Sequence, residues 1–192
     1  MNKKEAILEA ALREFSRNDF ENASVNKIIR DANTSKGNFY YYFNNKEELY
    51  VALLKKAWQK KAEFMNAIDE KDIFGYLEKQ VMAGIIFSRE NPEYYQLSRR
   101  FAKEKNTNIY NRVLNEITTE GNYERINTAT ELKYDRSTIS DIFPKEFVDS
   151  YIALILNNMN ELIDANDDIP KIEAKLLLII KVLKNGLEQK MK

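Results

Sequence analysis

The sequence predicts an all-α protein of about nine helices, with a small N-terminal head and a larger helical body. The 192 residues include only five Gly and three Pro, which argues against a β fold rich in turns. Hydrophobic residues make up 44% of the chain, which is enough for a substantial core. They recur along most of the chain at the three- and four-residue intervals of a buried helical face.

The head is expected to contain three helices. The first covers about residues 3–18 and is expected to turn one apolar face inward, with Phe20 packed beneath it (Ile7, Ala11, Leu12, Phe15). The second begins after Ser24, a favourable N-cap residue, and buries Val25, Ile28 and Ile29. The third runs from Ser35, a second N-cap, to Phe43.

The connection between the second and third helices is four residues long. It contains Asn33, and Asn enters the left-handed backbone region more easily than most residues, so it can replace the Gly that a tight turn favours. Two short helices joined in this way predict a helix-turn-helix, whose second helix enters the major groove of DNA. Asn45 and Glu48 then form an Asn variant of the capping box and open a fourth helix.

The body is predicted to be helical over most of its length. The helices are expected at about residues 46–68, 73–89, 91–105, 107–134 and 147–162, followed by a last helix after the turn at residues 167–170. Gly121 either breaks or bends the helix that begins at Thr107, and both alternatives remain open. The last helix contains five consecutive large apolar residues, Leu176–Ile180, so it needs cover on nearly all sides. The body can cover one side, and a second copy of the chain is the expected cover for the other.

Composition excludes several classes of function. Thirty basic and thirty acidic residues cancel, so the net charge indicates no nucleic-acid partner and excludes none. The absence of Cys and His removes disulfides, thiolate chemistry, the commonest metal ligands and the commonest general base. No catalytic site, metal or cofactor is therefore predicted. No signal peptide or membrane span is visible, and a cytoplasmic location is expected.

The segment from Ala32 to Leu49 closely resembles the DNA-binding signature of TetR/AcrR-type repressors. It reads ANTSKGNFYYYFNNKEEL, and the resemblance covers roughly the first 55 residues. Asn33 stands where the family usually has Gly, and Tyr41 where it often has His. The resemblance implies a domain division into a DNA-binding head, 1–46, and a helical body for ligand binding and dimerisation, 47–192.

Candidate DNA-binding residues lie on and beside the second helix of the motif. Lys36, Gly37 and Asn38 occupy its first turn, which points into the groove. By resemblance, Tyr40 and Lys46 would bind phosphate, and Ser24 would cap its helix and touch a phosphate. Asn26 either reads a base edge or faces solvent. The full set is Ser24, Asn26, Ser35, Lys36, Gly37, Asn38, Tyr40, Tyr41 and Lys46.

Two further sets of residues belong to the body. The aromatic residues there form either an ordinary core or the lining of an apolar ligand cavity, with Asn157 as a polar group that orients the ligand or joins two subunits. The candidate pocket residues are Phe64, Phe87, Tyr95, Phe101, Tyr110, Leu114 and Asn157. The candidate dimer interface, on the last two helices, comprises Tyr151, Ile155, Met159, Leu176, Leu178, Ile179 and Leu183.

These expectations together describe a homodimeric transcriptional regulator. It is expected to bind a pseudo-palindromic operator in double-stranded DNA, to act as a repressor, and to release DNA when a small apolar or aromatic ligand binds. The alternative is a helical scaffold that keeps the same motif but binds a protein partner.

Overall fold

A computed structural model of the chain describes residues 2–66, 68–105, 107–119, 135–158 and 167–188. Within these ranges the chain forms nine α-helices and one 3-10 turn, with two isolated bridges as its only β pairing. The prediction of an all-α fold is confirmed. The chain divides into two compact units: unit 1 is Met1–Glu63 with Phe87–Asn122, and unit 2 is Phe64–Ile86 with Tyr123–Lys192. The predicted functional boundary after residue 46 stays a prediction.

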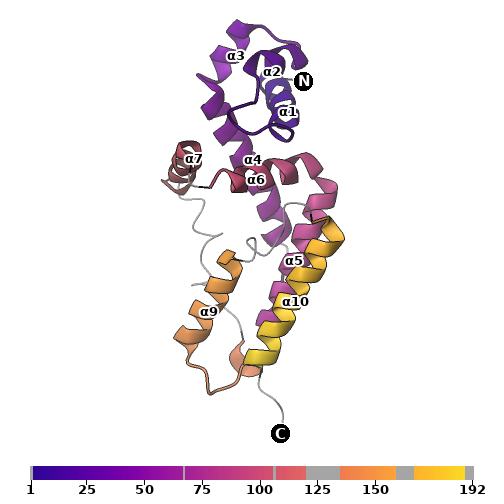
Figure 1. Cartoon of the computed structure of the whole chain (residues 1–192), viewed down its shortest axis with the longest axis vertical. Helices are drawn as coiled ribbons and strands as arrows, with labels where there is room; N and C mark the ends of the chain where they lie inside the picture. Colours follow the sequence, from indigo (N-terminus) through magenta and orange to yellow (C-terminus); the bar gives the residue numbers. More distant parts are fainter. Residues whose placement is uncertain (1, 67, 106, 120–134, 159–166, 189–192) are drawn as a thin grey trace. The chain divides into compact units, whose positions relative to one another are not determined.

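Both units are built from helices that are labelled in Figure 1. Unit 1 contains α1 (Lys3–Phe15), α2 (Val25–Asp31), α3 (Lys36–Tyr42), most of α4 (Lys46–Asn66), α6 (Pro92–Lys103) and α7 (Asn108–Thr119). Unit 2 contains most of α5 (Ile73–Glu90), the 3-10 turn η2 (Arg136–Thr138), α9 (Lys145–Asn158) and α10 (Ile169–Leu187).

In unit 1, α1 packs against α2, α3 and α6. The apolar faces predicted for the head meet there, and the core includes Ile7, Phe15, Ile28, Phe39 and Leu49, all fully buried. Phe20 is buried as predicted, with its ring centroid 6.4 Å from that of Phe15. Two helices of seven residues cannot hold a core by themselves, so α1 and α6 complete it.

Two helix ends and one cap differ from the predictions. The first helix ends at Phe15 and not near residue 18, because Ser16 caps it and its hydroxyl donates to the Arg13 carbonyl oxygen at 3.0 Å. Asn91 is the N-cap of α6, as predicted, but its side chain makes no capping hydrogen bond. The last helix already begins at Ile169, since the Asp168 side chain caps it by accepting from the Lys171 N–H. Gly121 and Met159 lie outside the described residues.

The described core of unit 2 draws its buried residues from α5, α9 and α10. Its buried residues include Ile73, Phe74, Leu77, Val148, Ile152, Ile172, Ile180, Leu183 and Leu187. The turn η2 is tied to both ends of this arrangement: the Thr138 hydroxyl hydrogen-bonds Asp72 at 3.0 Å, and the Ser140 N–H donates to the Leu187 carbonyl at 2.8 Å. These bonds connect the start of α5 to the end of α10 within the unit.

Candidate nucleic-acid interface

The helix-turn-helix begins with two side-chain caps. The Ser24 hydroxyl accepts a hydrogen bond from the Lys27 N–H at 3.3 Å, and the Ser35 hydroxyl accepts one from the Asn38 N–H at 3.1 Å. Each cap satisfies a backbone donor that has no partner within its helix. The local sequence therefore sets where both helices of the motif start.

The turn between α2 and α3 has the backbone conformation that the sequence predicts. Asn33 has a φ of 45°, in the left-handed region. Its N–H donates to the Arg30 carbonyl at 3.0 Å, and the next N–H, that of Thr34, donates to the Ile29 carbonyl at 3.2 Å. This pair of bonds is a Schellman motif, which ends α2 and directs the chain into α3.

Helix α3 has one buried face and one exposed face. Phe39 and Phe43 are buried, with ring centroids 6.2 Å apart. Tyr41 is 81% exposed and Tyr40 is 47% exposed, and the Lys36 ammonium lies 5.9 Å from the centre of the Tyr40 ring. Eight of the nine candidate DNA-binding residues are exposed in the structure, and all lie on α2, on α3 or at the caps of these helices: Ser24, Asn26, Ser35, Lys36, Gly37, Asn38, Tyr40 and Tyr41.

Lys46, the ninth candidate, is half-buried and makes contacts within the chain. Its ammonium donates to the carbonyls of Glu21 and Ala23 at 3.1 and 3.2 Å, and lies 4.7 Å from the centre of the Phe20 ring. Lys46 thus holds the segment that precedes α2. The capping box beside it differs from the predicted form: Asn45 accepts from the Glu48 N–H, but the Glu48 carboxylate accepts from Asn44.

A buried carboxylate that was not predicted from the sequence anchors the start of α2. Glu14, on α1, accepts from the Ser24 N–H at 3.1 Å and from the Lys27 ammonium at 2.5 Å. Burial alone would raise its pKa, but the hydrogen bonds from Lys27 and Ser24 outweigh it, so the pKa of Glu14 is lowered. Glu14 follows Ile7, Ala10 and Ala11 on the apolar face of α1, and this position was the available sequence signal.

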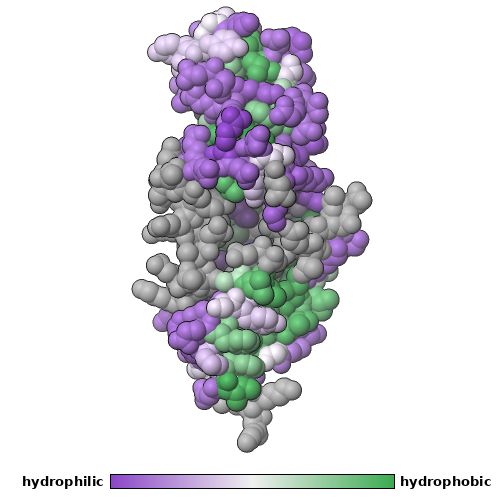
Figure 2. Space-filling view, turned by 60° about the vertical axis from the view of Figure 1, so that its left-hand side comes forward, coloured by the Kyte–Doolittle hydropathy of each residue, from purple (hydrophilic) through white to green (hydrophobic). Residues whose placement is uncertain are grey.

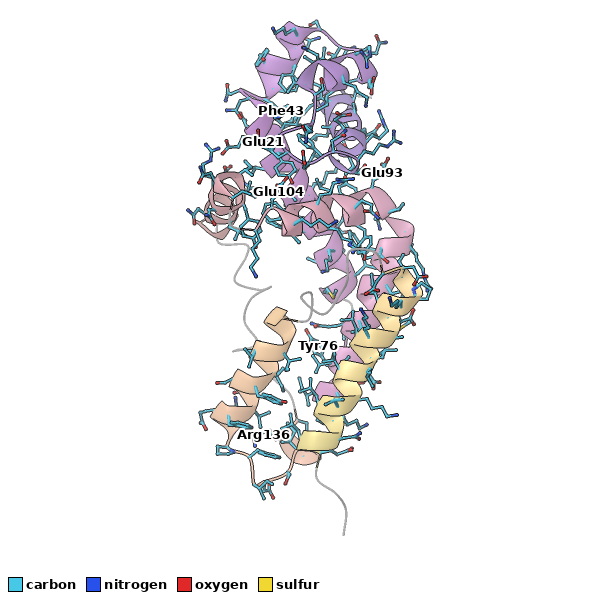
Figure 3. The ribbon with its side chains drawn as sticks, viewed as in Figure 1. Glu21, Phe43, Tyr76, Glu93, Glu104 and Arg136 are labelled. Carbon is cyan, nitrogen blue, oxygen red and sulfur yellow. The ribbon has the colours of Figure 1, made fainter. Side chains whose placement is uncertain are left out.

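Helix α6 binds the segment between α1 and α2 at two points. The Arg100 side chain donates to the Ser16 carbonyl at 2.8 Å, and Glu104 accepts from the Phe20 N–H at 2.8 Å and from the Tyr50 hydroxyl at 3.1 Å. Glu104 is labelled in Figure 3. Burial is the main cause that raises the pKa of the Glu104 carboxyl. No short-range sequence pattern indicates these bonds.

The candidate pocket residues are divided between the two units. In unit 1, Phe87 and Phe101 are buried, and the Phe101 ring stacks on Tyr110 with centroids 4.7 Å apart. Phe101 also packs near Trp58 and Tyr50, so in this unit it is part of an aromatic core. Tyr95 and Leu114 are half-buried in unit 1, and Phe64 is half-buried in unit 2. The side chain of Asn157 is not described.

The candidate dimer residues differ in exposure. Leu178 is 61% exposed and Tyr151 is 36% exposed, whereas Leu183 is buried in unit 2 and is not available at its surface. Ile155, Leu176 and Ile179 are half-buried, and Met159 lies outside the described residues. Neighbouring apolar side chains add to the exposed surface (Phe147, Leu154, Val182). Figure 2 shows apolar side chains gathered in the lower part of the view.

Two other kinds of site are absent from the described part of the chain. No helix there is both long and apolar enough to cross a membrane. Likewise, the described side chains contain no group of three or more carboxylates placed to hold a metal ion.

Comparison with known proteins points to one family. Residues 7–53 match the family model described as "Bacterial regulatory proteins, tetR family". The HTH-type transcriptional regulator RutR of Escherichia coli is 46% identical over 54 residues, which are 28% of this chain and 26% of RutR. The HTH-type transcriptional regulator QacR of Staphylococcus aureus is 28% identical over 135 residues, 64% of this chain and 72% of QacR.

The match to RutR therefore spans about a quarter of that relative. Solved structures resemble this chain over nearly its whole length. A TetR family transcriptional regulator from Chloroflexus aurantiacus superposes with a TM-score of 0.64 over 98% of this chain and 94% of that chain, at 19% identity. At this identity the likeness establishes the fold.

Proposed function

We propose, on the premise that this chain belongs to the tetR family of bacterial regulatory proteins, that it is a sequence-specific DNA-binding transcriptional regulator. The observation that carries the proposal is the exposed face of α3, which presents Lys36, Asn38 and Tyr40 beside a buried Phe39. The first turn of this helix would read base edges in the major groove, and the side chains beside it would contact phosphates.

The regulator is proposed to act as a homodimer. The exposed apolar residues of α9 and α10, Leu154 and Leu178 among them, support this because a monomer would leave them in water. A two-fold dimer places two recognition helices in successive major grooves, so the operator would be a pseudo-palindrome with half-sites about 34–36 Å apart. By resemblance to TetR/AcrR-type repressors, bound protein would repress transcription.

A small apolar or aromatic ligand is proposed to release the DNA. The DNA-binding heads have one arrangement that binds DNA and one that does not, and the ligand must bind the second more tightly than the first. A ligand with equal affinity for both would not change their populations. Helix α4 is proposed to couple ligand binding to DNA release. It begins at Lys46 in unit 1, and its last residues, from Phe64, belong to unit 2.

The DNA proposal is tested with a double variant, Lys36→Ala with Tyr40→Ala, and a fluorescence anisotropy assay. The target is the DNA upstream of the protein's own gene, or an operator selected from random sequence. We expect specific affinity to fall by at least about tenfold, which corresponds to roughly 1.4 kcal/mol. The slope of log affinity against log salt concentration should decrease in magnitude by about one.

The matched control is Lys181→Ala, which removes the same charge from an exposed position of α10 in unit 2. It should bind DNA as the unaltered protein does. If the unaltered protein shows no salt-sensitive, sequence-selective binding, or if the double variant binds normally while folded, the proposal is wrong and a protein partner becomes the better hypothesis.

A further inference from the structure

A groove of about 370 Å³ lies within unit 1, between α1, α4 and α6. Leu8 and Leu12 supply its apolar lining, and both are largely buried. The volume is within the range of sites that bind small molecules. None of the candidate residues for the apolar ligand pocket lines it.

Charged side chains of both signs surround this groove. Glu5 and Lys56 form an ion pair with each other across it. Four others, Glu9, Arg13, Lys60 and Glu93, form no ion pair within the described part of the chain. Figure 3 labels Glu93 at the start of α6. The groove therefore offers two carboxylates and two cations to a ligand.

Tyr94 adds a neutral polar group to the same groove. The Lys60 ammonium lies 5.7 Å from the centre of its ring, a distance typical of a cation–π contact. A tyrosine hydroxyl is protonated at neutral pH and can donate a hydrogen bond, and burial, the largest cause, raises the pKa of Tyr94 further.

We propose that this groove is a ligand site for a small zwitterion, such as a free amino acid or a dipeptide. The ligand ammonium would pair with Glu9 and Glu93, and its carboxylate with Arg13 and Lys60. A ligand of one sign would satisfy one pair of these groups and repel the other, so charge complementarity favours a molecule that carries both signs. Such binding does not require that the protein bind DNA.

The first experiment is a thermal-shift screen of the full chain with each of the twenty common amino acids and with glycylglycine, at about 10 mM, because a ligand that binds the folded state raises its melting temperature. We expect at least one compound to stabilise the protein. Its amide, which lacks the carboxylate, and its N-acetyl derivative, which lacks the ammonium, should each have no effect. If none of these compounds stabilises the protein, or if both blocked derivatives bind as well as the parent, the proposal is wrong.

The second experiment places the ligand in the groove. Glu9→Gln and Arg13→Gln should each weaken calorimetric affinity for the compound by at least about tenfold, since each removes one charge-assisted contact. The matched controls are Glu78→Gln and Lys181→Gln, which remove the same charges from exposed positions in unit 2. Unchanged affinity in both groove variants would place the compound elsewhere and overturn the assignment.

Discussion

At the scale of single residues, Glu14 is expected to stabilise the helix-turn-helix through its charge. Glu14→Gln keeps an acceptor for the Ser24 N–H but loses the pairing with the Lys27 ammonium. We expect the free energy of unfolding to fall by about 1 to 3 kcal/mol at neutral pH, since the carboxylate is buried. Urea denaturation measures this. Asp31→Asn, which removes an exposed partner of Lys27, should cost less than about 1 kcal/mol.

The stabilisation by Glu14 is expected to depend on pH. The pKa of Glu14 is lowered in the folded protein from 4.5, so its stabilisation is present above that value and is lost as the pH falls through the lower folded pKa. The difference in unfolding free energy between the unaltered protein and Glu14→Gln should therefore be constant near neutral pH and should shrink in acid below pH 4.5. A difference that does not change with pH would show that the charge contributes nothing.

The left-handed backbone conformation at position 33 is expected to favour Asn or Gly over other residues. Because its φ is 45°, Asn33→Ala should lower the unfolding free energy by about 1 to 2 kcal/mol, whereas Asn33→Gly should be nearly neutral. Chemical denaturation of both variants tests this. Asn26→Ala, an exposed Asn inside α2, is the control and should change stability by less than about 0.5 kcal/mol. Equal effects of Ala and Gly at position 33 would contradict the prediction.

At the scale of elements, α6 is expected to hold the segment between α1 and α2 through Glu104. Glu104→Ala leaves the Phe20 N–H and the Tyr50 hydroxyl without this acceptor and should cost about 2 to 3 kcal/mol. Glu104→Gln retains an acceptor and should cost less than about 1 kcal/mol. Hydrogen exchange of the Phe20 amide should quicken in the Ala variant and remain slow in the Gln variant. Equal protection in both would contradict the role of α6.

The contribution of Glu104 to stability is expected to depend on pH in the opposite direction to that of Glu14. Its pKa is raised in the folded state from 4.5, mainly by burial, so the protonated form is favoured there. The stability that this group contributes is present below pH 4.5 and is lost as the pH rises through the raised folded pKa. Relative to Glu104→Gln, the unaltered protein should therefore become less stable as the pH rises through this window. Thermal melts of both proteins at a series of pH values measure the difference.

At the scale of the whole molecule, the proposed dimer makes opposite predictions for two positions of α10. Leu178 is 61% exposed, so Leu178→Glu should give a folded monomer, whereas Leu183 is 3% exposed and Leu183→Glu should unfold unit 2. Light scattering and circular dichroism separate these outcomes. A stable dimer of this kind often buries more than about 2,000 Å². A monomeric unaltered protein at micromolar concentration, or a dimeric Leu178→Glu variant, would contradict this interface.

The sequence by itself determined the local features of the helix-turn-helix. It predicted the caps at Ser24 and Ser35, the left-handed turn at Asn33 and the buried pair Phe39 and Phe43, and the structure has all of them. These features depend on interactions within about one helical turn, so the residues that cause them are neighbours in the chain. The start of α10 was missed although its cap, Asp168, was a local signal as well.

Only the tertiary structure decided which polar groups meet. The Phe20 N–H and Glu104 are 84 positions apart, and Lys46 is 25 positions from Glu21, so no periodicity relates them. The same holds for burial on α10, where Leu178 is exposed and Ile180 is buried although both belong to one apolar run. The spacing of hydrophobic residues determines that a helix must be covered. The side that its own chain covers depends on the angle at which the helices pack, and this angle is set by side chains that are distant in the sequence.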